Sequence, residues 1–449
     1  MRNNKPLLLT LALGVFAGAL DLGVLSPALP AIAREFSVPT GDLAWIFTLY
    51  LLVTIASIAI AATLADRLGR RVVYMSCIGL FAIGSIVAVM APSYGVFLFA
   101  RALQALGAGG VFPVATAAIG DAVEPQRRGS ALGLVAATWG LAAVIGPAFG
   151  GIVTHFISWR WIFVLNFPLA AIVLLLAYRY LPRAAPRVRG PLDGFGLALL
   201  CIGLLLVTDG VETARLVAVL LGVLTLAGFV WWERAAQHPI VPLSLFTAPQ
   251  LAKTYLLEIA IGALEGSLFF IPTVLVGAQS LSYAAAGLIA SLGALMFVIV
   301  IPISGRALDR IGSRDVLLVG AILTEIGLAI FAVGFDSLPL TIVAMIVAGC
   351  GFGALLGAPT RYIVTSETSE AHRATAVGLL SQALIVGQIL GSSLAGGVIG
   401  LASSELHGYR DAYLCFCVVA LAALAIAATL NSRAREHDTQ AAEVHPLEA

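Results

Sequence analysis

Long apolar runs separated by short polar segments recur along the whole chain. A membrane-spanning helix needs about 20 mainly apolar residues, and runs of roughly that length predict spans at 7–32, 43–63, 72–91, 95–118, 129–153, 161–181, 193–210, 214–232, 251–276, 284–304, 315–333, 339–359, 374–401 and 410–430. The pattern therefore predicts an all-α polytopic membrane protein with fourteen spanning helices.

The first apolar run follows Arg2 and Lys5, as the core of a signal peptide would. It continues past Asp21 to about Ile32, however, which is too long for such a core. We expect this run to be retained as the first span.

Composition supports a membrane location. Hydrophobic residues make up 60% of the chain and charged residues 11%, whereas soluble domains carry about 25% charged residues. A net charge of +1 gives no basis for nucleic-acid binding. The cysteines all fall within apolar runs, where buried inert thiols are the expected state and neither a disulfide nor a metal site is expected: Cys77, Cys201, Cys350, Cys415 and Cys417.

The basic residues define an orientation. An even number of spans puts both termini on one side, and twenty of the 25 Lys and Arg residues fall on that side. Because cytoplasmic loops are enriched in Lys and Arg, we expect both termini to be cytoplasmic in a cell (inner or plasma) membrane. The polar tail after Asn431 is expected to be disordered.

Two distant segments repeat with almost the same offset. The segment Asp66-Arg67-Leu-Gly69 recurs 243 residues later as Asp309-Arg310-Ile-Gly312, and the Arg128 and Gly146 positions recur 245 residues later as Arg373 and Gly391. Parallel repeats of this kind build transporters with a substrate site between two halves near the bilayer midplane. The expected plan is a six-helix half at 1–190, an inserted helix pair and linker at 191–249, a second six-helix half at 250–431 and a tail at 432–449.

The repeated loops are candidates for a conformational latch. Gly69 permits a tight turn, and Asp66 can pair with a basic residue or with the N-terminus of a helix. The alternative is that these charges only set the topology. The latch residues would be Asp66, Arg67, Gly69, Arg70, Asp309 and Arg310.

Several motifs resemble one known family. The loop Leu64-Ala-Asp66-Arg67-Leu-Gly69-Arg70-Arg71 resembles the signature of the major facilitator superfamily. Further patterns are similar to its fourteen-span drug:proton antiporters: Leu20-Asp21 to Pro30, Arg101-Ala-Leu-Gln104 to Gly109, Gly146-Pro147-Ala-Phe-Gly150-Gly151 and Trp159-Arg160-Trp161 to Pro168. Ala62, Ala105 and Ala142 depart from family glycines, and Leu22 to Ser26 departs from the usual first span, which leaves the substrate open.

The motif Gly146-Pro147-x-x-Gly150-Gly151 has a physical interpretation of its own. Small residues allow close packing of helices, and proline kinks a helix by removing a backbone hydrogen bond. A packed, bent span could seal the two halves against leak, and the resemblance associates this motif with export. The alternative is generic small-residue packing.

Charged residues within the spans carry the expected mechanism. Each costs roughly 2.5–3.5 kcal/mol at mid-bilayer. Asp21 and Glu265 are 244 residues apart and so occupy equivalent places in the two halves. Our hypothesis is that Arg101 tunes Asp21 and that protonation breaks this contact; a static ion pair is the alternative. Glu265 could instead attract lipophilic cations, and Glu258 could be a second proton site or a gate.

Other assignments stay open at this stage. Glu325 is as compatible with a lipid-facing carboxylic acid as with a functional group. Residues that could line a substrate cavity, ordinary packing being the alternative for each, are Tyr50, Gln104, Trp139, Asn166, Glu265, Phe269 and Gln382.

The function that these features favour is proton-coupled antiport, exporting lipophilic small molecules, cations among them, by alternating access. Export of a lipid or endogenous metabolite and proton symport for uptake are the alternatives. The sequence has no phosphate-binding loop and no metal-ligand pattern, so we expect no enzyme activity, no cofactor and no metal. The expected partners are the small molecule, protons and the bilayer, and the expected functional form is a monomer.

Overall fold

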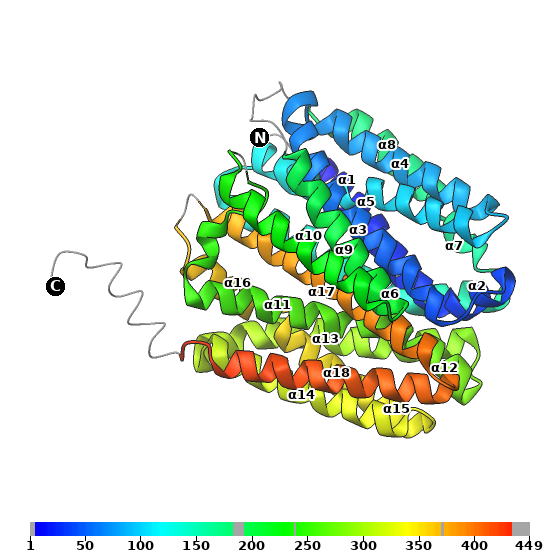
Figure 1. Cartoon of the computed structure of the whole chain (residues 1–449). Helices are drawn as coiled ribbons and strands as arrows, with labels where there is room; N and C mark the ends of the chain where they lie inside the picture. Colours follow the sequence, from blue (N-terminus) through cyan, green and yellow to red (C-terminus); the bar gives the residue numbers. More distant parts are fainter. Residues whose placement is uncertain (1–4, 183–192, 238, 370–371, 433–449) are drawn as a thin grey trace. The chain divides into compact units, whose positions relative to one another are not determined.

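The computed structural model describes residues 5–182, 193–237, 239–369 and 372–432. These residues form helices joined by short connections and contain no strand (Figure 1). Within them, fourteen helical segments are long and apolar enough to cross a membrane, which confirms the predicted number of spans. The predicted disordered tail lies outside the described residues, except for its first positions.

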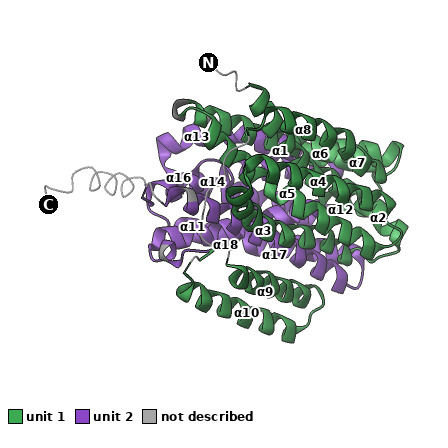
Figure 2. Cartoon of the chain, turned by 90° about the horizontal axis from the view of Figure 1, so that it is seen from above, with its two compact units in different colours: residues 1–240, 270–291 green, residues 241–269, 292–449 purple. Residues whose placement is uncertain are grey.

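The helices divide between two compact units, which Figure 2 distinguishes by colour. Unit 1 covers 1–240 and 270–291 and contains α1 (Lys5–Leu25), η1 (Ser26–Ala28), α2 (Leu29–Phe36), η2 (Gly41–Leu43), α3 (Ala44–Leu68), α4 (Arg70–Met90), α5 (Tyr94–Ala122), α6 (Pro125–Phe156), α7 (Arg160–Val164), α8 (Asn166–Tyr180), α9 (Gly194–Glu212), α10 (Leu216–Ala235) and α12 (Ile271–Gln279).

Unit 2 covers 241–269 and 292–449 and contains η3 (Leu243–Phe246), α11 (Pro249–Ser267), α14 (Ser313–Gly334), α15 (Leu338–Leu355), α16 (Pro359–Ser366), α17 (Arg373–Leu401) and α18 (Glu405–Ala428). Two elements have residues in both units: η4 (Leu268–Phe270) and α13 (Tyr283–Ile311). The predicted halves and insertion follow the sequence repeat rather than these compact units, and their limits stay a prediction.

In unit 1, α1 packs on α6 and α8, while α5 packs on α3 and α4. A buried cluster that includes Leu11, Tyr74 and Val173 joins α1, α4 and α8, and the Tyr74 hydroxyl donates to the Thr10 carbonyl across it. The helices α9 and α10 run side by side as a hairpin (Figure 1), and α9 packs on α3. Unit 1 therefore holds the inserted pair against the second span.

In unit 2, α11 packs on α17 and α18, and α14 packs on α15 and α18. Glycines allow the closest of these approaches. A Cβ atom at Gly387 would meet the Ile259 carbonyl oxygen, and one at Gly327 would lie 2.5 Å from the Ala348 nitrogen. Both contacts are too short for any side chain, so small residues set the spacing of these helices.

Several spans are broken, and prolines lie at or within a few residues of the breaks. The first span runs α1–η1–α2 through Pro27 and Pro30, and another runs α11–η4–α12 before Pro272. The sixth is broken at Leu165 between α7 and α8. In transporters, discontinuous helices carry substrate and ion sites because the break exposes backbone groups. Three polar residues lie beside these breaks: Asp21, Asn166 and Glu265.

The internal repeat is visible in local geometry. Gly69 and Gly312 adopt φ angles of 91° and 88°, a region that disfavours side chains. Arg128 Nε donates to the Val123 carbonyl at 3.0 Å, and Arg373 Nε donates to the Thr368 carbonyl at 3.3 Å. Each arginine therefore binds a carbonyl just past the end of the preceding helix, at positions related by the sequence offset.

Candidate functional site

A buried ion pair lies at the centre of unit 1. Arg101 Nη1 of α5 binds Asp21 Oδ2 of α1, and their side chains have no exposed surface. Removing one partner of a buried ion pair leaves an uncompensated charge, which is strongly destabilising. The two side chains that the sequence proposed as partners are thus in direct contact.

Two carboxamides complete the surroundings of Asp21. Gln104 Oε1 accepts a hydrogen bond from Arg101 Nη1 at 2.8 Å, and Gln104 Nε2 donates to Asp21 Oδ1 at 3.2 Å. Asn166 Nδ2, at the start of α8, donates to the same oxygen at 3.2 Å. Ser85 Oγ of α4 accepts from both Gln104 and Asn166, at 2.8 and 3.1 Å. Three donor side chains from two helices, α5 and α8, therefore surround the carboxylate.

An aromatic ring covers the guanidinium. The Tyr50 ring centroid lies 4.3 Å from Arg101 Cζ, a geometry that favours a cation. Arg101 Nε and Nη2 have no hydrogen-bond partner among the described residues. The face of the Tyr50 ring therefore offers the guanidinium a cation–π contact in place of these hydrogen bonds. Four helices and this ring together isolate the ion pair from water.

Three of the residues predicted to line a cavity lie beside the ion pair. Tyr50, Gln104 and Asn166 are 2%, 0% and 6% exposed and belong to the surroundings of the ion pair. Sequence reasoning missed Ser85. The signal that could have found it is a lone hydroxyl in an otherwise apolar stretch of the third span.

Unit 2 contains its own buried carboxylates. Glu265 Oε2 accepts a hydrogen bond from Gln388 Nε2 at 2.9 Å. Glu258 is 5% exposed; it interacts with Thr360 and Arg361 of α16, while its Oε2 atom lacks a hydrogen-bond partner within the described part of the chain. Both carboxylates therefore lie on α11, Glu265 next to the break and Glu258 in the middle of the helix.

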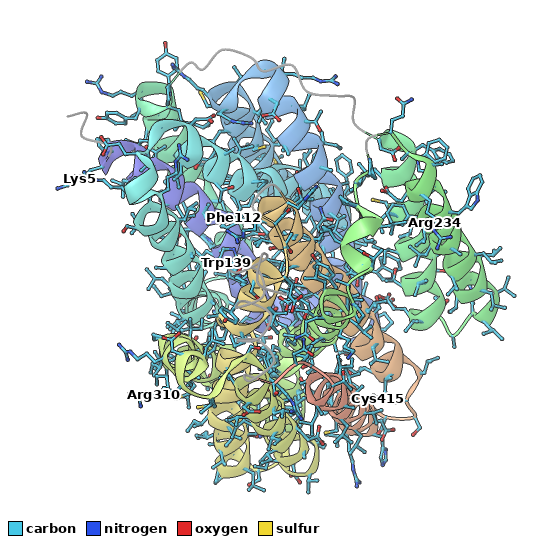
Figure 3. All side chains as sticks on the ribbon, turned by 90° about the vertical axis from the view of Figure 1, so that its left-hand side faces the viewer. Lys5, Phe112, Trp139, Arg234, Arg310 and Cys415 are labelled. Atoms are coloured by element: carbon cyan, nitrogen blue, oxygen red, sulfur yellow. The ribbon has the colours of Figure 1, made fainter. Side chains whose placement is uncertain are left out.

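The remaining predicted cavity residues differ in placement. Gln382 is half-buried on α17, and Gln388 rather than Gln382 contacts Glu265. Phe269 lies within η4, directly after the α11 break. Trp139 of α6 is 38% exposed and Phe112 of α5 is 43% exposed; Figure 3 labels both residues.

The glycine-proline motif of α6 makes backbone contacts on two sides. A Cβ at Gly150 would collide with the Val24 carbonyl oxygen, and one at Gly146 would lie 2.9 Å from Gly23 Cα. On the other side, a Cβ at Gly151 would collide with the Tyr283 carbonyl oxygen. The glycines therefore allow α6 to touch both α1 and the start of α13.

A serine hydroxyl lies beside Pro147, inside α6. Ser291 Oγ accepts a hydrogen bond from the Ala148 N–H at 2.8 Å, directly after Pro147. Kinked helices leave backbone groups to be satisfied by neighbouring side chains. Ser291 supplies such a partner from α13.

The first repeated loop contains a bridged arginine. Arg70 Nη1 lies 2.7 Å from Asp66 Oδ1, and Arg70 Nε donates to Asp121 Oδ2 at 3.2 Å. This arginine links the loop to the end of α5. The other predicted latch residues, Arg67, Asp309 and Arg310, are exposed on the surface, and Figure 3 shows Arg310.

The Trp159-Arg160 motif forms a polar clasp, which we name the α7 clasp. Arg160 pairs with Glu35 of α2 and donates to the Val89 and Ala91 carbonyls at 3.1 Å each. Trp159 Nε1 donates to the same carboxylate at 2.6 Å. Glu35, which sequence reasoning passed over, is the centre of this contact between α2 and α7.

Glu325 lies on α14, which packs on α18. Its Oε2 atom is buried and makes no hydrogen bond within the described residues.

The fourteen apolar helices of the described residues, several of them broken and enclosing charged side chains, are the architecture of a multi-pass membrane protein. The chain belongs to the major facilitator superfamily, whose family model matches residues 11–248 and 254–447.

Relatives of known sequence agree with this assignment. The uncharacterized MFS-type transporter YfiU of Bacillus subtilis (strain 168) is 30% identical over 416 residues, covering 89% of this chain and 80% of the relative. The multidrug resistance protein Stp of Mycobacterium tuberculosis (strain ATCC 25618 / H37Rv) is 30% identical over 412 residues, covering 88% and 76%.

Solved structures share the fold at lower identity. A bacterial homologue of the human lysosomal transporter Spinster has a TM-score of 0.69 at 19% identity, covering 95% of this chain and 97% of that one. The D-xylose–proton symporter has a TM-score of 0.71 at 16% identity, covering 95% and 98%. These similarities establish the fold of the chain.

Proposed function

We propose that this chain is a proton-coupled antiporter that exports lipophilic small molecules, cations among them, by alternating access. The observation that carries the proposal is the enclosed pair of Asp21 and Arg101. A carboxylate so deep in a span is energetically costly, and such residues usually have a function. Binding and release of a proton is the function that we propose for Asp21.

The proposed switch follows from the contacts of Asp21. In the ionised state it accepts bonds from Arg101, Gln104 and Asn166, which hold α1 against α5 and α8. Protonation removes the charge that attracts Arg101, so these contacts weaken. A ligand shifts a conformational equilibrium only by its differential affinity for the two states, and the proton has such a difference here.

The carboxylates of unit 2 support the choice of substrate class. Glu265 lies at the break of α11 with a single amide donor, Gln388. A carboxylate with few donors in an apolar site attracts cations, because little else compensates its charge. Relatives of this chain are named multidrug resistance proteins, which supports drug-like small molecules as the substrate class. Glu258 would then serve as a second proton site.

The direction of transport is proposed from α6. Its Gly146, Gly150 and Gly151 permit backbone contacts that leave no room for side chains, and such close packing hinders leak of the exported compound. We further propose cytoplasmic termini in the cell membrane, as the distribution of Lys and Arg favours, and function as a monomer.

The test uses inverted membrane vesicles with an acidic lumen and ethidium, a lipophilic cation, as probe. Under antiport, ethidium entry releases lumen protons, and a pH-sensitive dye reports a rise in lumen pH. Asp21→Asn should abolish this proton signal while the protein still binds ethidium. No proton signal from the wild-type chain, or proton entry together with substrate, would contradict the proposal.

A further inference from the structure

Ser85 is fully enclosed on α4, and it does not contact Asp21. Its hydroxyl donates to the Phe81 carbonyl at 2.9 Å. A serine hydroxyl has one hydrogen to donate and two lone pairs to accept with. Since the hydrogen is used by the backbone, Ser85 Oγ is left as an acceptor only.

The two carboxamides respond to that acceptor. Gln104 and Asn166 both turn their NH2 groups towards Ser85 Oγ. Each NH2 group has a second N–H, and both second donors reach Asp21 Oδ1 at 3.2 Å. The Gln104 carbonyl oxygen is held away from Asp21 by Arg101 Nη1. A backbone carbonyl thus fixes a hydroxyl, which fixes two amides as donors to the carboxylate.

We infer that Ser85 is a positioning residue for proton coupling: it orients Gln104 and Asn166 so that both stabilise ionised Asp21. Hydrogen bonds to the charged form of a group favour that form. Without the Ser85 acceptor, two buried N–H groups lose a partner, and either amide gains by turning its oxygen towards Asp21. That orientation favours the protonated acid. The inference rests on the proposed proton-coupling function of Asp21.

The other groups that face Asp21 do not take the place of Ser85 in orienting the two amides. The titratable groups beside it are Arg101 from α5 and Tyr50 from α3. The α6 helix, which also packs on α1, presents Gly146 and Gly150 against Gly23 and Val24. Among the described residues, α4 and α8 contribute the neutral side chains of Ser85 and Asn166 to this hydrogen-bond network. The number of amide hydrogen bonds donated to Asp21 therefore depends on Gln104, Asn166 and the Ser85 hydroxyl that orients them.

The experiment measures proton-coupled ethidium transport in vesicles across a range of pH for Ser85→Ala, Ser85→Thr and Ser57→Ala. Ser57 is a matched control, because it is a buried serine whose hydroxyl donates to the Leu106 carbonyl at 2.6 Å outside this network. We expect Ser85→Ala to move the midpoint of the pH profile about one unit to the alkaline side. Ser85→Thr, which keeps the hydroxyl, should restore the wild-type midpoint.

A second variant, on another helix, tests the inference independently if Ser85→Ala is poorly folded. Asn166→Leu removes one of the oriented donors and should move the midpoint in the same direction, and the double variant should shift less than the sum, as expected for residues in one network. A Ser85→Ala profile equal to that of Ser57→Ala overturns the inference. The proposed function fails separately, if Asp21→Asn retains the proton signal.

Discussion

Asp21 and Arg101, eighty residues apart in sequence, form an ion pair from which solvent is wholly excluded. The Tyr50 ring covers the guanidinium, and Gln104 binds both charged partners. A pair with so many shared contacts behaves as one unit, so the loss of either charge affects α1, α3 and α5 together. Removal of one charge or of both charges should therefore change protein stability and proton coupling in different ways. The structural and the functional role of the ion pair can thus be tested separately.

The first prediction separates a structural from a functional ion pair. Asp21→Asn leaves Arg101 buried without a counter-charge and should destabilise the protein by about 3–5 kcal/mol. The double variant Asp21→Asn/Arg101→Met removes both charges, so most of that stability should return. Thermal unfolding in detergent measures both effects. Transport should stay uncoupled from protons in the double variant; coupled transport by it would make the pair merely structural.

The length of the apolar runs predicted the fold, because the thickness of the bilayer sets the length of each span. Length and apolar character decide a span, so all fourteen were found, with edges within a few residues in most cases. Breaks such as that at Leu165 between α7 and α8 were not predicted, since they depend on how a neighbouring helix satisfies the freed backbone groups.

The candidate site was predicted in part. Asp21 and Arg101 were found because charges inside a span are rare, and the same reasoning named Gln104 and Asn166 as polar. That both amides bind Asp21 was not predicted, since spacing along one helix does not tell which neighbour a side chain meets. Their assignment to a substrate cavity stays a prediction. Ser85 and Glu35 were missed because each acts through contacts with helices distant in sequence.

The second prediction concerns the backbone contact between α6 and α1. Gly150→Ala places a Cβ against the Val24 carbonyl oxygen, so α6 must shift, at a cost of about 1–3 kcal/mol. Gly133→Ala is the control on the same helix, because nothing lies within 4 Å of its added Cβ. Thermal unfolding and passive ethidium leak into vesicles are measured. Equal behaviour of the two variants would show that the contact does not matter.

The third prediction concerns the α7 clasp. Glu35→Gln removes the partner of Arg160 and weakens the bond from Trp159. Both ionic side chains are partly exposed, so screening limits the loss to about 1 kcal/mol. The control Glu124→Gln breaks the ion pair between Glu124 and Arg127, whose charged atoms lie 3.8 Å apart. The two side chains are 74% and 71% exposed, so this variant should leave the unfolding temperature unchanged. If the two variants unfold at the same temperature, the clasp adds no stability.

The fourth prediction addresses the carboxylate at the α11 break. Glu265→Gln keeps the shape of the side chain and its contact with Gln388 but removes the charge that would attract a cation. Ethidium affinity should fall at least tenfold, which corresponds to about 1.4 kcal/mol, while an uncharged lipophilic dye should bind as before.

Fluorescence anisotropy of the purified protein measures both affinities. Glu325→Gln supplies the control, because Glu325 is another intramembrane carboxylate and lies on α14 instead of α11. Its removal should leave ethidium binding unchanged. An equal loss of ethidium affinity in both variants would mean that the cation responds to the overall charge of unit 2 and not to Glu265. Equal losses of both dyes with Glu265→Gln would instead assign Glu265 to packing, because a purely electrostatic contact distinguishes a cation from a neutral molecule.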